Sequence, residues 1–166
     1  MRELPAAAVM VIDSDELLSL LPHKNKMLLI SRVTEYDLYK RFLCSEYDVS
    51  EDCLFYDPAL DGVPAWMSFE FMAQAVSAFS GLTGRVMGIS PMIGFIMSVS
   101  SFEIKKSLIR KGDTVLVKVI EETKLDTIST FNCSVFIKDS QVSVARLMLI
   151  DVEDPMKFIE KNKHGK

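Results

Sequence analysis

Residues 64–82 read PAWMSFEFMAQAVSAFSGL, and this stretch decides the fold. Wound as a helix, it is apolar on nearly every side, which is typical of a helix that is buried over most of its surface. Pro64 stands where a proline favours the first turn of a helix. We therefore expect a long central helix over about residues 65–82, enclosed by the rest of the chain.

The segments after this helix are rich in β-branched residues, and several alternate between apolar and polar positions, which predicts strands. These runs are residues 92–100, 113–123, 128–137 and 141–152. One buried helix followed by antiparallel strands predicts an α+β fold in which a curved sheet wraps the helix. Such a sheet leaves an edge strand that a second subunit could cover.

The segments before the helix complete a single domain over residues 1–154. Asp13 and Glu16 have the spacing of a helix cap, which predicts a short helix over 14–21 that Pro22 ends. Strand-like runs follow at 27–33 and 41–47. Turn signals predict an irregular loop over residues 50–64, and residues 155–166 are expected to be a polar tail.

Composition excludes several classes of protein. Mean hydropathy is +0.20 and the net charge is −4, which argues for buried apolar surface and against nucleic-acid binding. The chain has no apolar run of about 18 residues that could span a membrane and no secretory signal pattern, so we expect a cytoplasmic protein. Its three cysteines are scattered, as expected of reduced thiols, and two histidines supply a metal site poorly.

Glu70 is the main candidate for chemistry. Glu70, Gln74 and Ser77 form one polar stripe on the apolar helix. Loss of hydration favours the protonated form of a carboxyl group, and such a group can donate a proton to a leaving hydroxyl. The alternative is an acid at a helix N-terminus that points to solvent. Gln74 could orient Glu70 or only bind a strand.

His23 and a basic cluster are weaker candidates. His23 could be a general base or a structural histidine at a helix-to-strand junction. His164 lies in the polar tail and is expected to be frayed. The basic cluster could dock an acidic partner or could be an ordinary solvated face; its members are Lys105, Lys106, Arg110 and Lys111.

Three segments together resemble the 3-hydroxyacyl-[acyl carrier protein] dehydratases, which have the hotdog fold. LLPHKNKMLLISRV (20–33) is similar to the "LPHR…LLVDRV" opening of that family. VPAWMSFEFMAQA (63–75) is similar to its helix segment "FPGVLILEAMAQA", and FEIKKSLIRKGDTVLV (102–117) to "ARFKRPVVPGDQM". The pattern resembles most of all the dehydratase-like subunits of bacterial aryl-polyene pathways.

The resemblance implies an elimination in which a histidine takes the α-proton of a 3-hydroxyacyl thioester and an acid on the central helix protonates the leaving hydroxyl. It implies that Glu70 is this acid. It further implies a substrate carried on the phosphopantetheine of an acyl carrier protein, and a tunnel between two paired subunits. Ala65, Trp66 and Gln74 are the expected substrate-binding residues, with the N–H of Ala65 polarising the thioester carbonyl. No other cofactor and no metal is expected.

One departure from the family matters. Counting back from Glu70 over the family's spacing to the "GHFP" histidine lands on Tyr56. A phenol is a poor base for an α-proton because its ordinary pKa is about 10. His23 matches the family's other, non-catalytic histidine. The resemblance therefore implies a composite site, with Glu70 facing a histidine from a different hotdog chain. A homodimer, a non-catalytic partner subunit and a hotdog thioesterase remain as alternatives.

Overall fold

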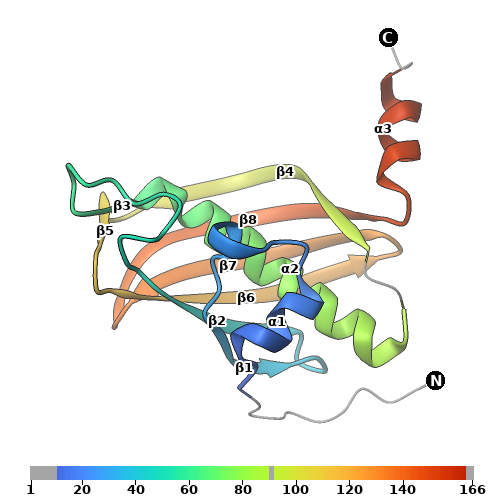
Figure 1. The fold of residues 1–166 in the computed structure, drawn as a ribbon. Coiled ribbons are helices and arrows are strands. Elements are labelled where there is room, and N and C mark those ends of the chain that lie inside the picture. The colour runs from blue at the N-terminus through green and yellow to red at the C-terminus, as the bar shows by residue number, and fades with distance from the viewer. Residues whose placement is uncertain (1–10, 90–91, 164–166) are drawn as a thin grey trace.

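A six-stranded antiparallel sheet forms the body of the molecule, in a computed structural model that describes residues 11–89 and 92–163. The strand order is β1-β2-β6-β7-β8-β4. Their bounds are β1 Arg32–Asp37, β2 Phe42–Asp48, β4 Ile93–Ile104, β6 Thr114–Leu125, β7 Ile128–Ile137 and β8 Ser140–Val152. A small ladder pairs β3 Gly62–Pro64 with β5 Leu108–Arg110 at one end of the molecule (Figure 1).

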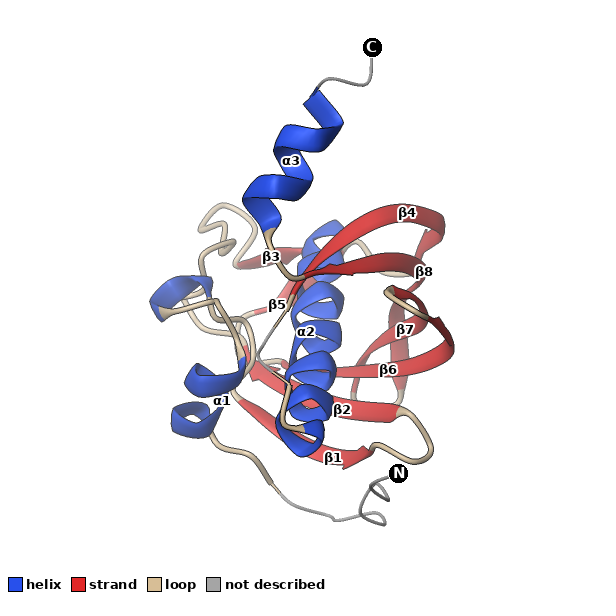
Figure 2. Cartoon of the chain, turned by 90° about the vertical axis from the view of Figure 1, so that its right-hand side faces the viewer, coloured by secondary structure: helices blue, strands red, loops and turns tan. Residues whose placement is uncertain are grey.

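The long helix α2 lies inside the curve of this sheet, as Figure 2 shows. The helical elements are α1 Ser14–Leu20, η1 Asn25–Met27, η2 Ala65–Met67, α2 Ser68–Met87 and α3 Pro155–Lys163. The predicted α+β fold, a central helix wrapped by a curved antiparallel sheet, is thereby confirmed. None of the helices within 11–89 and 92–163 has the length and apolar composition needed to cross a membrane.

Aromatic contacts fix α2 against the sheet. The ring of Phe71 lies 5.3 Å from that of Tyr47 on β2, and the ring of Phe79 lies 5.8 Å from that of Phe131 on β7. Both phenylalanines are buried. Burying such a side chain contributes about 1.5–3 kcal/mol. The Phe71 contact therefore holds the first turns of α2, which carry Glu70, and the Phe79 contact holds its middle.

The helix α2 runs past its predicted end, and glycines explain how. Gly81 does not end the helix. A Cβ atom there would lie 2.8 Å from the carbonyl oxygen of Leu20, so the glycine lets α1 pack closely on α2. The helix ends instead at Gly88, which has the left-handed φ of 68° that favours glycine at a C-terminus.

Three further segments differ from expectation. The loop expected to be irregular over residues 50–64 ends in strand β3. The run 27–33 is not a strand over its whole length, because η1 and a buried linker through Leu29 and Ile30 precede β1. The expected polar tail contains a helix, α3. His164 and residues 1–10 lie outside the described residues.

Candidate active site

Glu70 lies in the first turn of α2. Its neighbours Ser68 and Phe71 turn into the core and are fully buried. The Glu70 side chain points the other way and is 35% exposed. The expectation of a deeply sequestered carboxyl group is therefore wrong for the single chain. Glu70 stands at the rim of the core, where another molecule can reach it.

Gln74, one helical turn further on, is buried and holds Glu70 in place. Its Nε2 donates to Glu70 Oε1 at 3.0 Å and to the carbonyl oxygen of Met27 at 2.7 Å. Its Oε1 accepts from the backbone N–H of Leu29 at 2.8 Å. The first alternative for Gln74 agrees with this geometry, because the amide orients the acid. The second does not hold as stated, since Gln74 binds η1 and the linker before β1 and not a strand. Gln74 is a positioning residue in this arrangement, and its use in substrate binding stays a prediction.

His23 is the imidazole nearest to the acid in the described part of the chain. Its Nε2 lies 3.8 Å from Glu70 Oε1, and its side chain is 25% exposed. Its Nδ1 is buried and has no hydrogen-bond partner among the described residues. A catalytic histidine usually has such a partner, which fixes the tautomer and stabilises the imidazolium. The structure therefore brings His23 to the site without the support that a general base normally has.

Tyr56, at the expected histidine position, is held by its own loop. Its hydroxyl donates to Asp61 Oδ1 at 2.6 Å. This hydrogen bond raises the pKa of Tyr56 and lowers the pKa of Asp61, because it stabilises the neutral phenol and the ionised carboxylate together. Lys111 Nζ lies 3.7 Å from Asp61 Oδ1 and 2.6 Å from Glu51 Oε1. Tyr56 thus belongs to a polar network and is a still poorer base than a free phenol.

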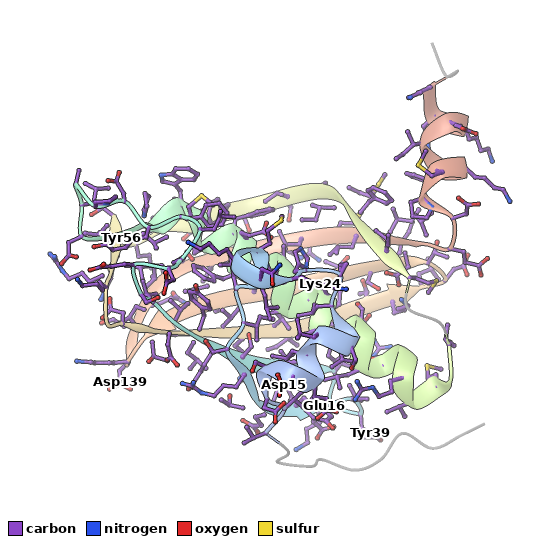
Figure 3. All side chains as sticks on the ribbon, viewed as in Figure 1. Asp15, Glu16, Lys24, Tyr39, Tyr56 and Asp139 are labelled. Atoms are coloured by element: carbon purple, nitrogen blue, oxygen red, sulfur yellow. The ribbon has the colours of Figure 1, made fainter. Side chains whose placement is uncertain are left out.

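Figure 3 separates these two regions of the chain clearly. Tyr56 lies in the loop beside β3, at the left of the view. Lys24, the residue after His23, lies over the middle of the molecule. In this view the loop of Tyr56 and the turn that carries Lys24 therefore lie apart.

The start of the central helix does not offer the expected donor. The N–H of Ala65 donates to the carbonyl oxygen of Ser107 at 3.0 Å, and Ala65 is fully buried. This hydrogen bond extends the β3–β5 ladder by one pair, so the N–H is already used. The geometry therefore does not support the expectation that it polarises a thioester carbonyl. Trp66, next to it, is 60% exposed and stands free to contact a ligand or a partner.

The predicted basic cluster is partly neutralised. Lys111 is paired with Glu51 and Asp61, and Lys105 donates a hydrogen bond to Gln141. Lys106 and Arg110 are exposed, and no salt bridge forms to them among the described residues. Within residues 11–89 and 92–163, no group of His, Cys, Asp and Glu could hold a metal ion.

A hollow of about 350 Å³ lies elsewhere on the chain, lined by residues that include Gly112, Asp113 and Lys138. Glu70 is not part of its lining. Glu70 itself is 35% exposed and can be reached from the surface of the lone chain.

Comparison with known proteins adds to this geometry. The ApeP-like family model, described as ApeP dehydratase, matches residues 16–160. A 3-hydroxyacyl-[acyl-carrier-protein] dehydratase FabZ from Bartonella quintana is 28% identical over 146 residues, which cover 86% of this chain and 92% of the relative. The FabZ of Chlamydia caviae is 35% identical over 85 residues, which cover 49% of this chain and 52% of the relative.

Solved structures share the fold. The dehydratase heterocomplex ApeI:P from Xenorhabdus doucetiae gives a TM-score of 0.78 at 17% identity, covering 87% of this chain and 95% of the matched one. Cj0977, a sigma28-regulated virulence protein from Campylobacter jejuni, gives a TM-score of 0.62 at 11% identity, covering 83% of this chain and 96% of the other.

Proposed function

The chain belongs to the ApeP-like dehydratase family, and on that premise we propose that it is the acid-bearing subunit of a 3-hydroxyacyl-thioester dehydratase. The family and the hydro-lyase class confirm what the sequence resemblance predicted. The observation that carries the proposal is Glu70, which Gln74 holds at 3.0 Å and which is 35% exposed. A carboxyl group that is both fixed and accessible suits proton transfer to a substrate.

The two oxygens of Glu70 have different tasks. Oε1 accepts from Gln74 and faces His23. Oε2 makes no hydrogen bond within the described part of the chain, so it is the oxygen that is open to a substrate. We assign the transferable proton to Oε2. In the elimination a base removes the α-proton, the C–H electrons form the Cα=Cβ bond, and the Cβ–O bond breaks as Glu70 protonates the hydroxyl to give water.

The base is proposed to be a histidine of a partner hotdog chain. Tyr56 is engaged with Asp61 at 2.6 Å, so this chain supplies no base from the family's usual position. The FabZ relatives are named as dehydratases of carrier-protein substrates, and a solved structure of similar fold is a heterocomplex. A partner that approaches the exposed side of Glu70 could also enclose the substrate.

His23 of the same chain is the second candidate for the base, because its Nε2 lies 3.8 Å from Glu70. His23→Gln distinguishes the two. If the partner supplies the base, the turnover number should fall by less than about tenfold; if His23 is the base, it should fall by 10² or more. The measurement is the initial rate of the complex at saturating substrate. Asn25→Ala, in the neighbouring η1, is the control for local disturbance of this turn.

The substrate is proposed to arrive on the phosphopantetheine of an acyl carrier protein. Such proteins are acidic, and Lys106 and Arg110 are the members of the basic cluster left unpaired in the described structure. The chemistry needs only two proton transfers, because the thioester acidifies the α-proton. Cys44, Cys53 and Cys133 are free thiols, which supports a reducing compartment such as the cytoplasm.

The experiment is a product analysis on the complex purified through a tag on this chain. A 3-hydroxyacyl carrier-protein thioester should be converted to the trans-2-enoyl thioester, detected by mass spectrometry. Release of free 3-hydroxy acid instead would assign the chain to the thioesterases. If the complex contains the partner but converts no substrate, this chain would be a non-catalytic subunit.

A further inference from the structure

The strand β4 is the outer strand of the sheet in the described part of the chain, where it pairs with β8 alone. Apolar side chains are exposed on it along its whole length. They are Ile93, Ile96, Met97, Val99 and Ile104. A long, apolar, unprotected edge invites pairing with another strand, and free proteins normally avoid one. The edge is therefore typical of a strand that a partner covers.

Two residues separate the end of β8 from the start of helix α3, which projects away from the sheet, as Figures 1 and 2 both show. Its start is well encoded. Asp154 Oδ1 accepts from the N–H of Lys157 at 3.1 Å, and Pro155 occupies the first helical position. An acidic cap followed by proline is a strong helix start. The helix is thus specified by the sequence itself.

The helix α3 nevertheless buries none of its residues, and it has nine of them. An isolated helix of fewer than about 12 residues is marginal in water, because most helical stability in proteins comes from packing an apolar face. The face exists here. At 100° per residue, Pro155, Met156, Phe158 and Ile159 share an arc of about 160° in the first turns of the helix, with Lys157 opposite. In the last turn Asn162 and Lys163 fall within this arc, so the apolar face is confined to the start of α3. Met156 is 65% exposed and Ile159 is 39% exposed.

One contact ties this face to β4. The ring of Phe158 stacks on that of Phe95, with centroids 5.5 Å apart and an interplanar angle of 21°. This stack places the start of the apolar face of α3 beside the first residues of β4. A chain that pairs along the first half of β4 would therefore come close to α3.

We propose that α3 is a contact arm that packs its Met156 and Ile159 face on the partner hotdog subunit that pairs along β4. The inference rests on the partner of the proposed function, and it adds a second contact surface to that pairing. The partner should present an apolar patch beside its own edge strand. The charged side of α3, with Lys157 and Lys161, stays in solvent.

The test uses the complex purified through a tag on this chain. Met156→Glu combined with Ile159→Glu places carboxylates on the apolar face, and Lys161→Glu places one on the opposite face as the matched control. We expect the dissociation constant, from sedimentation velocity on a dilution series, to rise at least about tenfold for the double variant. It should stay within about twofold for the control. Circular dichroism checks that each lone chain is folded.

Two further variants separate the possible failures. Met97→Glu on β4 should release the partner, and Glu70→Gln should keep it. If the α3 double variant binds the partner as tightly as the unaltered chain while Met97→Glu does not, the contact arm is wrong and the pairing stands. If no histidine-bearing hotdog chain accompanies the unaltered protein, the partner and the contact arm are both wrong.

Discussion

The turn of α2 around Glu70 and the loop around Tyr56 are the two regions that the sequence resemblance assigns to the family's catalytic pair, and their surroundings differ. Around Glu70 every buried polar group of Gln74 is satisfied, while one carboxylate oxygen stays open. Around Tyr56 the reactive position has become part of a closed network with Asp61 and Lys111. Under the proposed function, the first region holds the acid and the second has a structural role.

The difference suggests how a chain looks when it has lost one half of an active site: the residue at that position is held by hydrogen bonds of its own. A position free of catalytic duty can form hydrogen bonds that satisfy its side chain, as Tyr56 does. Under the proposed function, Glu70 keeps its task and also keeps an accessible carboxyl group. The contrast supports a site that is completed from outside the chain.

Replacing the acid should have the largest effect. In the complex, Glu70→Gln keeps the shape and the contact with Gln74 but cannot donate a proton, so the turnover number should fall by roughly 10²–10⁴. Steady-state dehydration of a carrier-protein substrate measures this. Glu35→Gln, an exposed glutamate on β1, should change nothing, and an active Glu70→Gln complex would remove the acid from the mechanism.

Replacing the amide that supports the acid should mainly cost stability. Gln74→Leu leaves the N–H of Leu29 and the carbonyl of Met27 without their partner. The free energy of unfolding should fall by about 2–4 kcal/mol, because two unsatisfied groups remain. Denaturant titration of the lone chain measures it. For Ser77→Ala, on the same polar stripe, the free energy of unfolding should stay within about 0.5 kcal/mol of that of the unaltered chain. Equal free energies for the two variants would mean that the hydrogen bonds of Gln74 do not stabilise the fold.

Carrier docking should show a smaller, selective effect. Lys106→Glu together with Arg110→Glu should raise the KM for a carrier-protein thioester several-fold, because an acidic partner would then meet like charge. The KM for the same acyl group on free pantetheine should not change. The comparison of the two substrates at low salt is the measurement. An equal rise for both would place these residues in the acyl site instead.

The network at Tyr56 should show the smallest effect. Tyr56→Phe removes the donor to Asp61, so the depressed pKa of Asp61 should rise toward its ordinary value. A carboxyl pKa that is lower in the folded than in the unfolded state stabilises the fold at pH values above the unfolded-state pKa. This stabilisation is lost as the pH falls through the folded-state pKa. The variant, in which the pKa of Asp61 is less depressed, should therefore lose less stability on acidification. Carboxyl NMR titration of the lone chain follows this. Dehydration should stay within twofold; a large loss would return Tyr56 to the site.

Most of the fold could be predicted from the sequence because its signals are local. The central helix is apolar on nearly every side, and the strands after it show alternation, so their periods decide the element type. The prediction of a strand over 27–33 was partly wrong because a long-range contact decides the structure there. The apolar residues of this run are buried in a linker because Gln74, far along the chain, accepts from Leu29 N–H. The helix α3 had local signals in Asp154 and Pro155, which the charged residues after them concealed.

The candidate site could be predicted only in part. Glu70 stood out as an acid on an apolar helix, and Tyr56 stood out by its spacing. The approach of His23 to Glu70 could not be foreseen, because it depends on how η1 folds against α2. The same holds for the N–H of Ala65, which is engaged by Ser107 through the pairing of β3 with β5.

The division of the reaction between two chains is tested most directly by titration of the separated histidine-bearing partner into this chain while dehydration is followed. Neither protein alone should convert the substrate at an appreciable rate, and activity should rise to a plateau at equal amounts of the two. Full activity of this chain by itself, unchanged by the partner, would contradict the account.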